Sequence, residues 1–141
     1  MPMRSVLCLA AIAIAVVFAA MPARAAGVND PTGPWLTEDG SGVVQVVSCG
    51  PALCGTIVWS QKPTDASGQK LCNMAVLGDA VSSGPTNWSK GWIYSPKAGG
   101  KYPVDLTLPG DGRLHLHVSA GLFGRDQVWT RPSQPFTPCQ P

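Results

Sequence analysis

The sequence has little charge, and what charge it has is not clustered. Asp, Glu, Lys and Arg make up 13% of the 141 residues, with 10 basic and 8 acidic side chains. Two basic residues, Arg4 and Arg24, lie in the first 25 positions, so 8 basic and 8 acidic side chains follow Ala25. Binding to nucleic acid or to an anionic membrane surface needs clustered Lys and Arg. We therefore expect no nucleic-acid partner.

The sequence also lacks the short motifs of common enzyme sites. It has no phosphate-cradling glycine loop and no dinucleotide-binding fingerprint, and Gly40-Ser41-Gly42 does not match the serine elbow. Glu38 is the only glutamate and the aspartates are scattered, so no carboxylate pair for hydrolysis is indicated. The sequence supplies no catalytic residues and no cofactor motif, and it favours a non-enzymatic role.

No segment after Ala25 shows the 3.6-residue apolar period of a capped amphipathic helix. The chain instead has 16 glycines and 14 prolines, and turn signals recur at short intervals. This pattern predicts an all-β domain with an irregular segment at 61–90. The candidate strands are 34–38, 42–49, 54–60, 91–95, 101–108, 113–119 and 125–131, with a further short piece within 74–77.

The one long apolar run stands at the N-terminus. A short basic start precedes the apolar residues 6–20, and Ala23-Arg24-Ala25 is a small-x-small cleavage pattern. Residues 1–25 are therefore predicted to be a removable signal peptide, which places the protein in the periplasm or outside the cell. The alternative is a retained membrane anchor, but the run is short for a span. The 116 residues after Ala25 suit one domain with no membrane-spanning segment.

Four cysteines follow Ala25, and an even number in an oxidising compartment indicates disulfides. Three pairings are possible. We favour Cys49–Cys54, which would bridge a turn between two strands, and Cys72–Cys139, which would tether the proline-rich tail 132–141. The alternative is a redox role for Cys49 and Cys54. Four residues separate these two cysteines rather than two, however, and no helix start is near to lower a thiol pKa.

Alternating apolar residues set the register of the hairpin between residues 101 and 119. Opposed residues lie on the same side of a sheet. The expected opposed pairs are Leu108 with Leu114, Leu106 with Leu116, Val104 with Val118, Asp105 with His117 and Thr107 with His115. A series of such hairpins closes most economically into a small barrel. We therefore predict an antiparallel meander barrel of about seven to eight strands within residues 26–131.

Several motifs resemble one known family. The first, Gly33-Pro34-Trp35-Leu36-Thr37, is similar to the glycine-x-tryptophan opening strand of lipocalin-like barrels. The later ones are Cys49 to Trp59, Trp88, Gly91 to Pro96, Gly99 to Tyr102, Gly110 to Leu114, Leu122 to Arg125 and Trp129 to Arg131. Together, over about 33–131, they resemble the bacterial domain-of-unknown-function family 2147. The resemblance implies an exported lipocalin-like or streptavidin-like barrel, and it supplies no catalytic residues.

The resemblance also implies a role for Trp35 and Arg131. In lipocalin-like barrels an arginine of the last strand often stacks over the tryptophan of the first and closes one end of the barrel. Such a cation–π contact is worth about 0.5–2 kcal/mol. The alternative is that Arg131 binds an anionic ligand inside the barrel.

Two histidines give a hypothesis of metal chemistry. His115 and His117 lie on the same face of one strand, and Asp105 is expected opposite His117. Three protein ligands are what a catalytic zinc needs, so a metal-assisted hydrolase is one hypothesis. The neighbouring leucines take the core face, however, so the same three residues also fit ordinary solvent-exposed cross-strand pairs.

Aromatic residues give the other lead. Trp59, Trp92 and Tyr94 fall on predicted strands, with Trp88 at a possible rim. Around a barrel mouth they would suit a small apolar or sugar-like ligand. The alternative is that they fill the interior, because an eight-stranded barrel is barely wide enough for its own side chains. If Cys49 and Cys54 lie opposite each other across their hairpin, Trp59 is expected on the same face of the sheet as Ile57.

Three functions follow from these observations. The first is a periplasmic barrel that binds a small ligand. The second is a barrel with a filled core that works by protein–protein contact in the cell envelope. The third is the metal-assisted hydrolase. A cavity lined by the aromatic residues would favour the first over the second.

Overall fold

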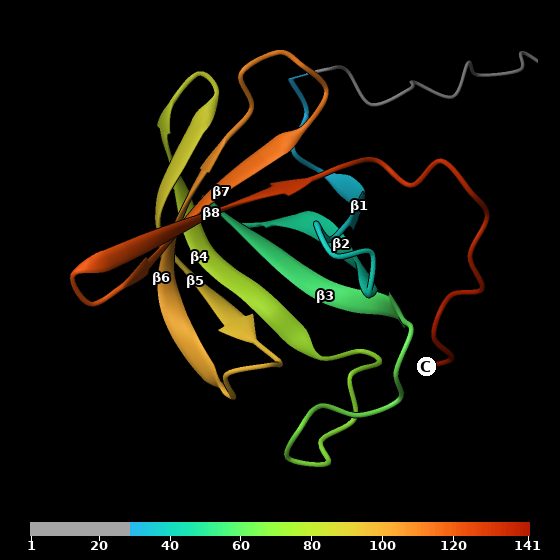
Figure 1. The fold of residues 1–141 in the computed structure, drawn as a ribbon. Helices are drawn as coiled ribbons and strands as arrows, with labels where there is room; N and C mark the ends of the chain where they lie inside the picture. Colours follow the sequence, from blue (N-terminus) through green and yellow to red (C-terminus); the bar gives the residue numbers. More distant parts are fainter. Residues whose placement is uncertain (1–28) are drawn as a thin grey trace, which may run out of the picture.

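The computed structural model describes residues 29–141, so the predicted signal peptide at 1–25 lies outside the described residues. The described chain is one curled antiparallel sheet (Figure 1). Its strands are β1 Gly33–Leu36, β2 Gly42–Cys49, β3 Ala52–Ser60, β4 Ala75–Gly84, β5 Asn87–Ser95, β6 Gly100–Thr107, β7 Leu114–Ala120 and β8 Phe123–Trp129. Between residues 29 and 141 no apolar helix of membrane-spanning length occurs.

Each strand pairs with the next along the chain, as in a meander. The sheet meets itself where Leu36 and Thr130 pair, with Leu36 N–H donating to the Thr130 carbonyl at 2.7 Å and Thr130 N–H donating to the Leu36 carbonyl at 3.0 Å. Because β1 has only four residues, this seam is short. The result is an all-β half-barrel of eight strands, which confirms the predicted fold class.

The inward side chains form one continuous apolar cluster. Its largest fully buried members are Trp35, Leu77, Leu106, Leu108, Leu114 and Leu116. The predicted register of the β6–β7 hairpin is confirmed from Val104 opposite Val118 to Thr107 opposite His115. Leucines on one face of each strand therefore fill the inside of the sheet, as their alternation requires.

The expectation of an irregular segment over 61–90 was wrong for its second half. Strand β4 runs from Ala75 to Gly84, and β5 already begins at Asn87. Register shifts interrupt the pairing of β4 with β3, and Asp79 and Lys90 have positive φ angles of 57° and 61°. These irregularities break the apolar alternation that would have revealed β4. The first half of the segment, the connection between β3 and β4, contains no named strand, and it buries Leu71 in the core.

The expected face of Trp59 was also wrong. The register of β2 against β3 shifts so that Val44 lies opposite Ile57 whereas Val43 lies opposite Trp59. Strand β3 thus contains one extra residue, Val58, which is a β-bulge. Val44 and Ile57 belong to the core cluster and Val43 does not. Trp59 therefore lies with Val43 on the outer face of the sheet.

The chain after β8 runs back along the outside of the sheet to the end of β3 (Figure 1). Cys139 N–H donates to the Val58 carbonyl at 2.6 Å, and the Asn73 side-chain amide donates to the Gln140 carbonyl at 2.7 Å. The structure pairs Cys72 with Cys139, and it pairs Cys49 with Cys54 across the β2–β3 turn. The tail is thereby fixed against β3.

Candidate functional site

The four aromatic residues expected to form one ligand site do not meet. Trp88 lies opposite Leu106 and packs against the core. Tyr94 also packs against the core, and its hydroxyl donates to a carboxylate oxygen of Asp65 at 2.9 Å. Trp59 lies on the outer face of the sheet, and the ring of Trp92 rests against Gly78. Trp88 and Tyr94 therefore serve as packing residues, and the structure does not bring the four aromatic side chains together as one lining.

The ring of Trp92 is in contact with a glycine backbone and with a lysine side chain. A Cβ atom added at Gly78 would lie 2.6 Å from the indole, so the ring rests directly on the glycine backbone. The Lys101 ammonium lies 4.0 Å from the ring centroid, and the indole N–H donates to Asp79 at 3.0 Å. A sugar needs a free aromatic face on which to stack. The contacts of Trp92 with Gly78 and Lys101 compete with such stacking.

Trp59 borders a hollow between the sheet and the tail. The hollow has a volume of about 350 Å³, and its apolar lining includes Leu36, Val43, Trp59, Pro132, Pro135 and Phe136. Small-ligand sites commonly occupy about 300–1,000 Å³. The hollow lies outside the core cluster, and the tail that forms one wall is held by the Cys72–Cys139 pair.

Tyr94 and Asp65 fasten the β3–β4 connection to β5. Hydrogen bonds to the Asp65 carboxylate, first from the Ser67 side chain and also from Tyr94, lower the pKa of Asp65. The same bond to Asp65 raises the pKa of the Tyr94 hydroxyl. The lowered pKa favours an ionised Asp65 and the raised pKa favours a neutral Tyr94, so the hydroxyl donates and the carboxylate accepts. This arrangement accounts for Tyr94 as a structural anchor.

Arg131 stacks on Trp35, as the resemblance implied. The guanidinium carbon lies 3.7 Å from the centroid of the Trp35 ring. The same guanidinium donates to the carbonyl oxygens of Pro34 at 3.0 Å and Asp30 at 2.8 Å. Partial burial lowers the pKa of Arg131, and the nearby Asp30 opposes this shift. These contacts join the chain just after β8 to β1 and to the residues that precede it.

The three residues of the metal hypothesis do not form a ligand set. His115 Nε2 lies 2.8 Å from Asp111 Oδ2, and His117 Nδ1 lies 2.6 Å from Asp126 Oδ1. Asp105 is opposite His117 in the register, and all three predicted ligands border a surface hollow of about 280 Å³. Nowhere in the described chain, 29–141, do three His, Cys, Asp or Glu side chains come together to hold a metal ion.

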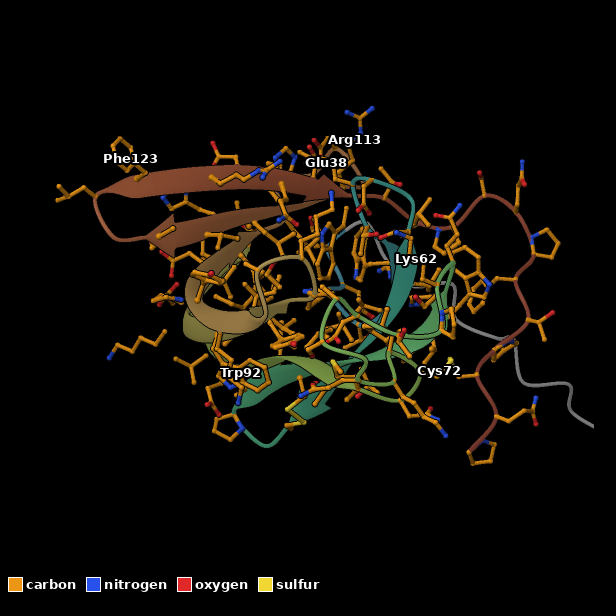
Figure 2. The ribbon with its side chains drawn as sticks, turned by 60° about the horizontal axis from the view of Figure 1, so that its bottom comes forward. Glu38, Lys62, Cys72, Trp92, Arg113 and Phe123 are labelled. Atoms are coloured by element: carbon orange, nitrogen blue, oxygen red, sulfur yellow. A yellow bond between two sulfur atoms is a disulfide. The ribbon has the colours of Figure 1, made fainter. Side chains whose placement is uncertain are left out.

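No functional role was predicted for the β7–β8 hairpin, yet within residues 29–141 it carries the most exposed large apolar side chains. Leu122 is 98% exposed and Phe123 79% exposed. Figure 2 shows Phe123 at the end of a hairpin that projects beyond the rest of the sheet. The signal was present, because the turn Gly121-Leu122-Phe123-Gly124 is apolar at a place where polar turn residues are usual.

Glu38 is a second residue that sequence reasoning did not find. Its carboxylate, in the β1–β2 connection, accepts the backbone N–H of Val128 at 2.7 Å. Strand β1 ends at Leu36 and cannot pair with this part of β8. The only glutamate of the chain thus occupies a hydrogen-bonding position that β1 leaves open.

Comparison with family models identifies the chain. Residues 33–131 match the model described as an uncharacterized protein conserved in bacteria, DUF2147. The chain belongs to the DUF2147 family. The match runs from the first residue of β1 to Arg131, so it includes both residues of the closing cation–π contact. Comparison with curated proteins gives no match.

One solved structure shares the fold of this DUF2147 chain. It is protein HP1028 of Helicobacter pylori, whose description states that it belongs to the lipocalin family. The two chains are 19% identical, with a TM-score of 0.58 over 74% of this chain and 84% of the other. At this identity the likeness shows a lipocalin-like fold for the DUF2147 domain and nothing beyond the fold.

Proposed function

We propose that this DUF2147 protein is an exported barrel of the bacterial cell envelope that binds another protein through its outer surface. The interior supports this proposal because it is occupied by its own side chains, from Trp35 at one end to Leu106 and Leu116. The aromatic residues that would have lined an internal ligand site lie apart. The binding surface that we propose therefore lies on the outside of the sheet.

Export rests on the N-terminal pattern and on the cysteines. We propose that residues 1–25 are removed, that the barrel spans 26–131 and that the tail 132–141 is tethered through Cys139. Both close cysteine pairs suit the oxidising periplasm or the cell exterior. A tail of ten residues with four prolines would otherwise have few contacts to hold it.

The observation that carries the protein-binding role is the exposure of Leu122 and Phe123 at the tip of a projecting hairpin. Large apolar side chains that stand in water are costly, and when they gather on one projection they mark an interaction site. No internal ligand explains them, since they lie beyond the core cluster. A partner that covered both side chains would remove them from water.

Photo-crosslinking in the producing bacterium tests this proposal. A photoreactive phenylalanine analogue at Phe123 should form a covalent adduct with a partner protein, while the same analogue at the exposed Lys62, in the connection between β3 and β4, should not. Both positions are exposed, so the variants should fold equally well. The proposal fails if position 123 gives no more adduct than position 62.

A second function is favoured by the hollow beside Trp59. Its size and apolar lining suit a small apolar ligand, and a lipocalin-like fold is compatible with such a role. An apolar fluorescent probe, phenylnaphthylamine, should then gain fluorescence with the native protein and much less with Trp59→Ala. Equal responses from the two proteins, or no response from either, would leave this function without support.

A further inference from the structure

Strand β8 presents an unpaired edge along most of its length. It pairs with β7 without interruption from Phe123 to Trp129. On its other side the seam with β1 begins only at Thr130. Within the part of the chain that the structure describes, no strand pairs with residues 123–127 on that side. Figure 1 shows the β7–β8 hairpin pointing away from β1.

The hydrogen-bonding groups on this edge can be assigned. In an antiparallel ladder, the N–H and C=O groups of one residue point to the same neighbour, and successive residues alternate. Thr130 uses both groups toward Leu36, and Val128 directs its N–H to Glu38. The even-numbered residues of β8 therefore point away from β7. Gly124 and Asp126 each offer one donor and one acceptor to an added strand.

Glu38 marks where this edge stops. Its carboxylate holds the Val128 N–H, and beyond it the Leu36–Thr130 pair closes the seam. An added strand therefore has room along residues 123–127 and is blocked beyond them. Natural proteins use charged groups in this way to limit pairing at exposed edges.

The side chains beside the edge carry one uncompensated charge. Asp126 lies on the outer face and is paired with His117. Phe123 and Arg125 lie on the opposite face, two residues apart, and both are exposed. Among residues 29–141 no acidic side chain forms an ion pair with Arg125. A partner strand would be favoured by a carboxylate opposite Arg125 and an apolar side chain opposite Phe123.

We propose that β8 binds an extended segment of the partner protein as a ninth, antiparallel strand. The added strand runs antiparallel to β8. Read from its own N-terminus, it therefore places one residue opposite Arg125 and, two residues later, another opposite Phe123. The recognised pattern is therefore an acidic residue, any residue, then an apolar residue. Main-chain bonds to Gly124 and Asp126 supply affinity, and the charge of Arg125 supplies selectivity. This proposal rests on the protein-binding function and names the chemistry of its partner.

A second copy of this chain fits the edge less well. Symmetric antiparallel pairing centred on Arg125 or on Asp126 would put like charges directly opposite each other, which is destabilising. Centring the pair on Gly124 avoids that conflict but leaves the main-chain groups of Gly124 as the only regular hydrogen-bonding pair. A different chain with a complementary acidic residue is the occupant that the edge favours.

The test uses two blocked heptapeptides and the mature protein labelled with nitrogen-15. One peptide has the sequence Thr-Val-Thr-Glu-Thr-Val-Thr. The other has lysine in place of the central glutamate. We expect the glutamate peptide to bind about 3–10-fold more tightly, since one exposed ion pair replaces one repulsion. Its binding should slow the exchange of the Gly124 and Asp126 amide hydrogens and leave distant strands unchanged.

Charge reversal supplies the decisive control. The variant Arg125→Glu should bind the lysine peptide more tightly than the glutamate peptide, whereas Arg113→Glu, an equal charge change in the exposed β6–β7 connection, should keep the native preference. Equal affinity of both peptides, no binding at millimolar concentration, or a preference that Arg125→Glu leaves intact would overturn the proposal. Protection of Gly124 and Asp126 that depends on protein concentration without peptide would replace it with self-association.

The two proposals fail separately. If position 123 crosslinks to a protein while the heptapeptide leaves the β8 amides unchanged, the protein-binding function stands and strand addition is wrong. If the peptide binds as expected but no cellular adduct forms at position 123, the edge is competent and the proposed function is what fails.

Discussion

The guanidinium of Arg131 lies over the ring of Trp35, with 3.7 Å between the guanidinium carbon and the ring centroid. The two residues stand at opposite ends of the folded domain's sequence, and the contact joins them where the sheet meets itself. Because β1 is short, the Leu36–Thr130 hydrogen bonds alone make a weak seam. We therefore expect the stacked pair to be a principal contact that holds the half-barrel closed.

Removal of the Arg131 side chain should destabilise the fold. Arg131→Ala loses the stacking on Trp35 and two hydrogen bonds to carbonyl groups. We expect the free energy of unfolding in urea to fall by about 1–3 kcal/mol, with Arg131→Lys intermediate. Arg113→Ala, at an exposed position, is the matched control. An Arg131→Ala protein as stable as this control would show that the contact does not hold the seam.

Loss of Glu38 should expose the Val128 amide. In Glu38→Ala the Val128 N–H loses its acceptor, and its hydrogen exchange should become about 10-fold faster, equivalent to about 1.4 kcal/mol of lost local protection. Glu38→Gln keeps an acceptor oxygen, so its Val128 amide should exchange at a rate between those of the native protein and Glu38→Ala. Exchange followed by NMR gives the rate for this amide. Unchanged exchange in Glu38→Ala would mean that Glu38 does not limit the β8 edge.

The two cysteine pairs should contribute unequally to stability. On the chain-entropy account, a disulfide stabilises more when it closes a longer loop. The Cys72–Cys139 pair spans 67 residues and the Cys49–Cys54 pair spans 5. We expect replacement of both residues by serine to cost about 4 kcal/mol for the long loop and about 2 kcal/mol for the short one. Urea unfolding of the two double variants measures both, and the opposite order would refute this account.

Acid should weaken the turn between β1 and β2. Burial raises the pKa of Asp39, but hydrogen bonds from Ser41 and Thr37 outweigh it and hold the pKa below its ordinary value of 3.8. A carboxyl with a lowered folded-state pKa stabilises the fold above its unfolded-state pKa, and this contribution is lost as the pH falls through the folded-state value. Stability should therefore drop below about pH 4, and less steeply in Asp39→Asn. An equal acid dependence of both proteins would argue against this role.

Regular alternation made part of the fold predictable. Between Val104 and Thr107 in β6, and between Leu114 and Ser119 in β7, each apolar residue is followed by a polar one. This alternation fixes which faces of the two strands turn inward, and the structure has the predicted register with Leu106 opposite Leu116. In β4 the alternation is interrupted, since Val76 and Leu77 are both buried and Asp79 has a positive φ angle. A local pattern cannot reveal a strand whose regularity is lost at bulges.

The candidate sites depended on tertiary detail that local patterns do not contain. One extra residue in β3 moved Trp59 to the outer face. The free edge of β8 exists because β1 ends at Leu36, and a difference in the lengths of two strands that are distant in sequence is not visible in either strand alone. Phe123 was visible in the sequence, but its exposure depends on how far the β7–β8 hairpin projects.

Native mass spectrometry of the protein isolated from the periplasm tests the central claim most directly, namely that this exported barrel has a filled interior and works through its outer surface. We predict the mass of residues 26–141 with two disulfides and no small molecule retained by the folded chain. A stoichiometric small molecule that leaves only on unfolding, or a chain that still carries residues 1–25, would contradict the account.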